Sequence, residues 1–161
     1  MYHGERFNAY SHLAGSMLAV AALVLMTVKA NGPYQLASAL TYGICLILLY
    51  LGSTLYHSIP QPKIKAILQK VDHCMIYLLI AGSYTPFTLI PLKGSWGWSL
   101  FGVSWSLALF GIIQELTIGR KSEKRLLSMM IYVIMGWLIL VAVSPLVRTL
   151  PFAGLFWLAL G

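Results

Sequence analysis

The chain has 161 residues, of which 59% are hydrophobic and 9% are charged, and its 11 Lys and Arg against 4 Asp and Glu give a formal net charge of +7. Soluble domains carry roughly 25% charged residues, so a chain with a mean hydropathy of +0.81 lacks the polar side chains to cover its surface in water. A membrane protein is therefore expected. The basic residues lie between apolar stretches, where they set membrane orientation, and nucleic-acid binding is not expected.

Five apolar stretches are each long enough to cross a hydrocarbon core of ~30 Å as a helix. They cover residues 10–28, 36–57, 72–90, 96–114 and 126–147. A sixth block, 152–161, covers about half the membrane, and no polar tail follows it. The sequence therefore predicts one all-α transmembrane domain over 1–161, a polytopic bundle of five full spans and a partial sixth, truncated at its C-terminal end.

The distribution of Lys and Arg predicts the orientation of the bundle. Eight basic residues fall before the first span or in the second-to-third and fourth-to-fifth connections, and three fall on the other side. Because basic loops are retained in the cytoplasm, the N-terminus is expected to be cytoplasmic. The second-to-third connection also carries an apolar stripe at helical spacing. It is either a short helix on the membrane surface or a basic loop with a chance pattern. That stripe consists of Ile64, Ile67, Leu68 and Val71.

Ionisable side chains are costly inside a membrane, and in this chain they lie near the ends of the predicted spans on the cytoplasmic side. Ser53 and His57 are four residues apart and so project from one face of the second span. Asp72 begins the third span and can return to the same depth. An imidazole, a hydroxyl and a carboxylate together are typical of a metal site with an activated water, for which zinc is a common ion. We therefore predict His57 as a metal ligand and Asp72 and Ser53 as catalytic residues.

A polar stripe precedes the first span at three- and four-residue spacing. Glu5, Asn8 and His12 are expected to support the metal centre, and the alternative is a helix entry capped by Asn8 or Ser11. His73 points about 100° away from Asp72 and is expected to lie against a neighbouring helix or the headgroups. Glu115 is expected to be a solvated interfacial charge.

The segment 82–86, Gly-Ser-Tyr-Thr-Pro, is expected to kink a helix and let helices pack closely. Cys45 and Cys74 lie in apolar stretches without CxxC spacing and are expected to be buried thiols.

Taken together, these motifs resemble the bacterial haemolysin III family, which belongs with the progestin and adipoQ receptors and, more distantly, the alkaline ceramidases. The resemblance runs from Glu5 to the last residue. It is carried by Glu5-x2-Asn8-x2-Ser11-His12, Ser53-x3-His57, Asp72 with the segment 76–86, and Met135-Gly136-Trp137.

The resemblance implies a seven-helix bundle in the bacterial inner membrane with a cytoplasmic N-terminus. It also implies a zinc ion held by His57 and by an H-x3-H pair on the seventh helix, with Ser53 and Asp72 acting through the metal-bound water. This chain stops before such a pair. One histidine cannot complete a zinc site, so we expect an incomplete centre and no hydrolysis by this chain as it stands.

Three functions are compatible with the sequence. The first is a zinc-dependent hydrolase acting on a lipid amide near the cytoplasmic leaflet. The second is a cytolytic or pore-forming protein, as the family name suggests, although the spans lack the polar stripe a monomeric pore needs. The third is a sensor or regulator of membrane composition that uses the same pocket without turnover. Membrane lipids are the expected partners, and self-association is left open.

Overall fold

The regular structure of the protein is entirely helical in the computed structural model, which describes residues 3–117 and 122–160. This confirms the all-α prediction. The helices are α1 (Arg6–Lys29), α2 (Pro33–Ser58), α3 (Pro62–Leu89), α4 (Ser95–Thr117), α5 (Ser122–Trp137), α6 (Val143–Thr149) and α7 (Phe152–Leu160), with 3-10 segments η1 (His3–Glu5) and η2 (Leu138–Ala142).

Proline and glycine set the helix boundaries at three of the connections. Pro33 and Pro62 occupy the first turns of α2 and α3, where the missing N–H is not needed. Gly32 and Gly94 have φ angles of +92° and +103° immediately before α2 and α4. These left-handed conformations reverse the chain in a few residues, so consecutive helices run antiparallel.

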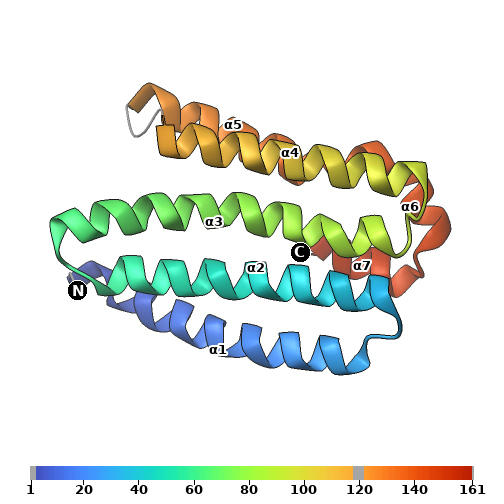
Figure 1. The fold of residues 1–161 in the computed structure, drawn as a ribbon, viewed down its shortest axis with the longest axis horizontal. Coiled ribbons are helices and arrows are strands. Elements are labelled where there is room, and N and C mark those ends of the chain that lie inside the picture. The colour runs from blue at the N-terminus through green and yellow to red at the C-terminus, as the bar shows by residue number, and fades with distance from the viewer. Residues whose placement is uncertain (1–2, 118–121, 161) are drawn as a thin grey trace.

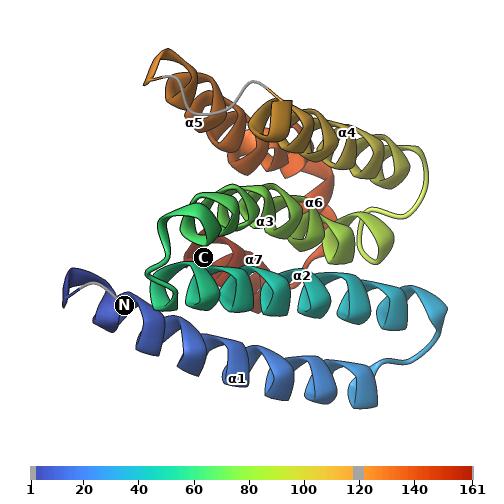
Figure 2. The same ribbon diagram turned by 60° about the vertical axis from the view of Figure 1, so that its left-hand side comes forward.

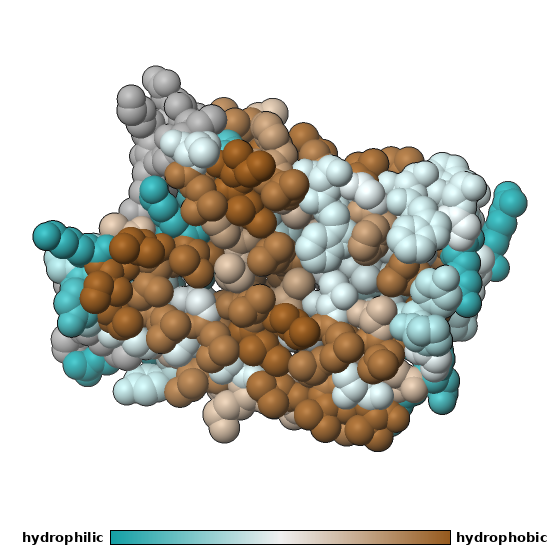
Figure 3. Space-filling model, viewed as in Figure 1, coloured by the Kyte–Doolittle hydropathy of each residue, from teal (hydrophilic) through white to brown (hydrophobic). Residues whose placement is uncertain are grey.

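The helices form a layered bundle with α3 in the middle (Figures 1 and 2). α1 packs on α2, α2 packs on α3, and α4 and α5 lie on the other side of α3. The space-filling view shows a broad apolar surface over α1 and α2, with hydrophilic residues gathered at the two ends of the helices (Figure 3). This distribution is the one expected of a bundle that crosses a membrane.

Four segments of the described chain are long and apolar enough to cross a membrane. They are Arg6–Lys29, Pro33–Ser58, Ser95–Thr117 and Leu126–Thr149. α3, which contains the predicted third span, does not reach the same hydropathy. The central position of α3 explains its lower hydropathy, since side chains that face other helices do not contact lipid and can be polar. Tyr77, Thr85 and Thr88 on α3 are at most 2% exposed.

Small residues bring α3 close to both neighbours. A Cβ atom on Gly82 would lie 2.9 Å from the Sγ atom of Cys45 on α2, and a Cβ atom on Gly111 of α4 would collide with the Tyr77 ring. The close packing expected of the 82–86 segment is therefore confirmed at Gly82. Cys45 and Cys74 are buried free thiols, as predicted.

α3 begins ten residues before the predicted third span. The apolar stripe within residues 64–71 is helical, but it belongs to the first turns of α3 and not to a separate surface helix or a loop. At ~1.5 Å per residue, α3 is about 42 Å long, more than the hydrocarbon thickness. Its first turns therefore extend toward the headgroups.

The predicted fifth span is not one continuous helix. α5 ends at Trp137, and the chain passes through η2 before α6. The Tyr84 hydroxyl of α3 donates to the Met135 carbonyl at 2.6 Å and accepts from the Ile139 N–H at 2.8 Å. These bonds satisfy backbone groups at the interruption, which is how an irregular helix is tolerated at membrane depth.

The count of five spans and the cytoplasmic N-terminus stay predictions. Of the basic residues in the fourth-to-fifth connection, Arg120 and Lys121 lie outside the described residues, and the side chains of Lys124 and Arg125 are not described either.

Candidate functional site

His57 lies in the last turn of α2, with Ser53 one turn earlier on the same helix. The His57 side chain is 15% exposed, and its Nδ1 atom is buried without a hydrogen-bond partner. A carboxylate oxygen of Glu5 lies 3.7 Å from this Nδ1 atom. The carboxylate can therefore orient the ring electrostatically, while the distance is too long for a good hydrogen bond.

Lys65, on the first turns of α3, holds Glu5 in place. Its Nζ atom donates to the second carboxylate oxygen of Glu5 and to the Tyr56 carbonyl, both at 2.8 Å. The ammonium also lies 4.4 Å from the centroid of the Tyr56 ring. The hydrogen bond from Lys65 lowers the pKa of Glu5 below its ordinary value, because it stabilises the ionised carboxylate. Sequence reasoning missed Lys65, although its spacing from Pro62 places it on the first turn of α3.

His12 comes from α1 and brings a second imidazole to this end of the bundle. Its ring centroid is 6.0 Å from that of His57 and 5.7 Å from that of Tyr50, and both ring pairs are T-shaped. The Nδ1 atom of His12 is also buried without a partner. We refer to Glu5, His12, Ser53, His57 and Lys65 as the His57 cluster.

The other predicted site residues are less closely involved. Ser53 is buried at 4% exposure. Asp72 is half-buried on α3, and within 3–117 and 122–160 no hydrogen bond or ion pair joins it to Ser53 or His57. Asn8 is exposed on α1, and its carbonyl accepts a bond from the Ser11 hydroxyl. The capping alternative is wrong, because α1 begins at Arg6 and both residues lie inside the helix.

The His57 cluster contains two imidazoles and one carboxylate that could in principle bind a zinc ion. Zinc in proteins takes three or four protein ligands in tetrahedral geometry. Across the described residues, no three His, Cys, Asp or Glu side chains lie close enough to share one ion. His57 has the right chemistry and an unpartnered nitrogen, but these residues alone do not fit a complete zinc centre.

A second polar cluster lies between α3, α4 and α5, and it corrects the expectation for Glu115. Glu115 is 6% exposed and is not a solvated charge. One carboxylate oxygen lies 2.9 Å from Nδ1 of His73, and the other accepts from the Ser128 hydroxyl at 3.2 Å. His73 lies against a neighbouring helix, as expected, and its partner there is this carboxylate.

The remaining contacts of this cluster tie α5 to α3 and α4. The Ser128 hydroxyl also lies 3.0 Å from Oε1 of Gln114, and the Tyr132 hydroxyl donates to the His73 carbonyl at 3.0 Å. We call His73, Gln114, Glu115, Ser128 and Tyr132 the His73 cluster. In the sequence, the one feature that could have indicated this cluster was the adjacent polar pair Gln114–Glu115 at the end of an apolar span.

An all-helical chain with several apolar helices and a polar cluster at one end of the bundle defines a multi-pass membrane protein. Residues 1–161 match the sequence model of the family described as "Haemolysin-III related". The chain belongs to the haemolysin III family.

Two curated relatives agree with this assignment. The chain is 44% identical over 160 residues to the "Hemolysin-3 homolog" of Bacillus subtilis (strain 168) and 44% identical over 160 residues to "Hemolysin-3" of Bacillus cereus. Each match covers 98% of this chain, and 74% and 72% of the two relatives. No solved structure matches the chain.

Proposed function

We propose that this protein is a hydrolase-like membrane protein that acts on an amide-linked lipid at the His57 end of the bundle, in a bacterial inner membrane. The observation that carries the proposal is the His57 imidazole, which is mostly buried and whose Nδ1 atom faces the Glu5 carboxylate at 3.7 Å. A carboxylate behind an imidazole fixes its orientation and favours its role as a ligand or a base.

Each residue of the cluster has a separate task in this proposal. Lys65 keeps Glu5 ionised and in position, Glu5 orients His57, and Ser53 supplies a hydroxyl one turn away. Asp72 is assigned the role of proton acceptor. His57 would hold a zinc ion as one ligand, the other ligands would have to come from outside the described residues, and the ion would supply an activated water.

Metal analysis tests the site. Protein purified from its native gene is expected to carry about one zinc ion per chain, and His57→Ala is expected to lose it. His73→Ala is the matched control, because His73 is also half-buried but belongs to the other cluster. Retention of zinc by His57→Ala, or equal loss in both variants, would exclude His57 as a specific ligand.

Lipid analysis tests the reaction. A strain lacking the gene is expected to accumulate one class of amide-linked lipid, and Asp72→Asn and Ser53→Ala are expected not to restore turnover. A general shift in acyl-chain composition without an accumulating substrate would instead indicate a regulator that binds lipid without hydrolysis.

The printed names of the relatives support a second candidate function, cytolysis. Purified protein added to red cells or dye-loaded vesicles tests it directly. Lysis that persists in His57→Ala would show a cytolytic activity independent of the His57 cluster, whereas the absence of dye release would remove this candidate.

A further inference from the structure

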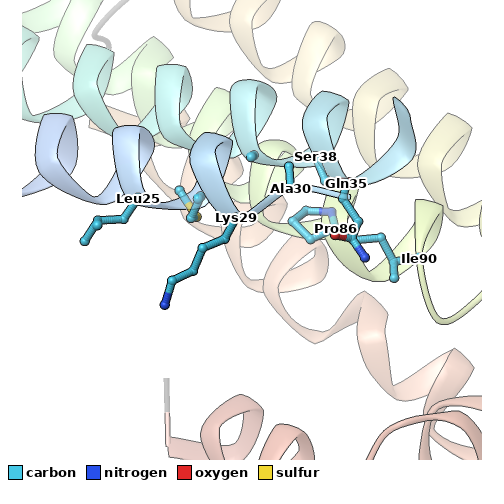
Figure 4. Close-up of a pocket in the computed structure, with 9 residues that line it drawn as sticks. Leu25, Lys29, Ala30, Gln35, Ser38, Pro86 and Ile90 are labelled. Atoms are coloured by element: carbon cyan, nitrogen blue, oxygen red, sulfur yellow. The ribbon is translucent and has the colours of Figure 1, made fainter. Parts of the chain in front are cut away.

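A groove opens at the end of the bundle opposite the His57 cluster, between the last turns of α1, the first turns of α2 and the last turns of α3 (Figure 4). Its volume is about 470 Å³, which is within the range of small-molecule sites. Most of its wall is apolar. The lining consists of Leu25, Met26, Lys29, Ala30, Gln35, Ser38, Ala39, Pro86 and Ile90.

The polarity of the groove changes with depth. Lys29 and Gln35 lie at its mouth, close to the ends of α1 and α2, and Lys29 extends outward from the rim (Figure 4). Leu25, Met26 and Pro86 lie about one helical turn deeper, since each precedes its helix end by a further three or four residues. A cation therefore lies at the aqueous end of an open, mostly apolar groove.

A helix terminus adds to the positive charge at the mouth. α2 begins beside Lys29, and its N-cap residue, Gly32, offers no side-chain acceptor to the first-turn N–H groups. Uncapped N–H groups and the helix dipole favour an anion at such a position. Lys29, three residues before Gly32, adds a positive charge near this terminus, and the two features together favour a phosphate at the mouth of the groove.

Ser38 provides an independent indication of a ligand. The residue is 2% exposed, it lines the groove, and its Oγ atom has no hydrogen-bond partner. Ser38 is five residues beyond Pro33 and so lies about 7.5 Å further along the helix. The headgroup layer is about 5–7 Å thick on each side of a bilayer. A hydroxyl at this depth is placed at the boundary where the ester groups of a phospholipid lie.

We propose that this groove binds one anionic phospholipid. The phosphate lies near Lys29 and the first turn of α2, the Ser38 hydroxyl turns from its buried position to donate to an ester carbonyl, and one acyl chain fills the apolar part. The charge at the mouth selects an anionic headgroup, and the graded polarity selects an amphiphile over a soluble anion. The site is separate from the His57 end and does not depend on hydrolysis there.

Native mass spectrometry of the purified protein in detergent tests the proposal. With equal amounts of phosphatidylglycerol and phosphatidylcholine added, the protein is expected to retain one phosphatidylglycerol in preference. Lys29→Gln is expected to weaken this retention about fivefold, the effect of one basic residue near a lipid surface. Ser38→Ala is expected to weaken it about two- to fivefold, because one hydrogen bond is lost.

Lys93→Gln is the matched control. Lys93 is the next basic residue at the same end of the bundle, but its ammonium lies 5.4 Å from the Tyr34 ring centroid and it does not line the groove. Lys29 is exposed, so its substitution is not expected to impair folding. Equal retention of the two lipids, or equal losses in Lys29→Gln and Lys93→Gln, would overturn the proposal. Displacement of phosphatidylglycerol by a lower concentration of oleate would overturn it in favour of a fatty-acid site.

Discussion

The two polar clusters both pair an imidazole with a carboxylate, but they differ in how completely the pair is satisfied. In the His57 cluster the carboxylate lies 3.7 Å from the ring nitrogen and gives its short contact to Lys65, and the Glu5 side chain is 21% exposed. In the His73 cluster the carboxylate lies 2.9 Å from the ring, its side chain is 7% exposed, and both of its oxygens have partners.

This difference separates a site that is available for chemistry from one that holds helices together. The His57 ring makes no hydrogen bond through Nδ1 and faces the Glu5 carboxylate at 3.7 Å, so it can turn or take up a proton without breaking a hydrogen bond. The His73 cluster offers no such opening, because Glu115 already bridges α3 and α5. We therefore expect substitutions in the His73 cluster to change stability and substitutions in the His57 cluster to change function.

The largest effect is expected for Glu115→Ala. This variant removes the carboxylate and leaves the His73 ring without its partner on α4, whereas the Ser128 hydroxyl keeps Gln114 as an acceptor. Breaking a buried pair in this way costs about 3 kcal/mol in the free energy of unfolding. The loss can be measured by denaturation with sodium dodecyl sulfate in mixed micelles. Zinc content and lipid turnover per folded molecule should change little.

Leu116→Ala is the control for that measurement, since Leu116 neighbours Glu115 in sequence but is 53% exposed. We expect it to unfold close to the unsubstituted protein. If Glu115→Ala were no less stable than Leu116→Ala, the His73 cluster would not be the structural element that the comparison requires.

A smaller effect is expected for Ser128→Ala. Its hydroxyl lies between Gln114 and Glu115 and is the contact by which α5 reaches α4 in this cluster. The loss of such a bond is expected to lower the free energy of unfolding by about 1 kcal/mol. Ser16→Ala is the matched control, because the Ser16 hydroxyl bonds only a carbonyl of its own helix, Leu13. Equal effects in the two variants would show that Ser128 adds nothing between helices.

Spacing within one helix was enough to predict part of the site. The four-residue step from Ser53 to His57 places both on one face of α2, and the stripe containing Glu5 and His12 places both near the start of α1. These are consequences of helical periodicity, which depends on sequence alone. The grouping of Glu5 and His12 around His57 follows because α1 and α2 are antiparallel neighbours joined by a short turn.

Contacts between helices could not be predicted in the same way. The partner of His73 is 42 residues away on α4, and nothing in the spacing of α3 or α4 specifies their relative rotation. Glu115 looked like an exposed charge because basic residues follow it closely in sequence. The interruption at η2 was missed for a similar reason, since the groups freed there are satisfied by Tyr84, more than fifty residues earlier.

The smallest effect, and the one that tests the His57 cluster most directly, is the pH dependence of Glu5. Its pKa is lowered in the folded protein by the hydrogen bond from Lys65, relative to an ordinary value of 4.5. A carboxyl group with a lowered folded-state pKa stabilises the protein above its unfolded-state pKa, and this contribution is lost as the pH falls through the folded-state pKa. Glu5→Gln should therefore be less stable than the unsubstituted protein at pH 7, by less than about 1 kcal/mol for a partly exposed pair.

The difference in stability between the two proteins should then shrink below pH 4.5. Thermal unfolding in detergent from pH 7 to pH 3, with both proteins measured at equal ionic strength, follows this change. When Lys65→Met is present in both proteins, the difference in stability caused by Glu5→Gln should be smaller. Without the ammonium, Glu5 loses the contact that favours its ionised form. A difference that stayed constant with pH would mean that Glu5 acts through packing alone. The carboxylate could then not be the group that orients His57, and the contrast between the two clusters would fail.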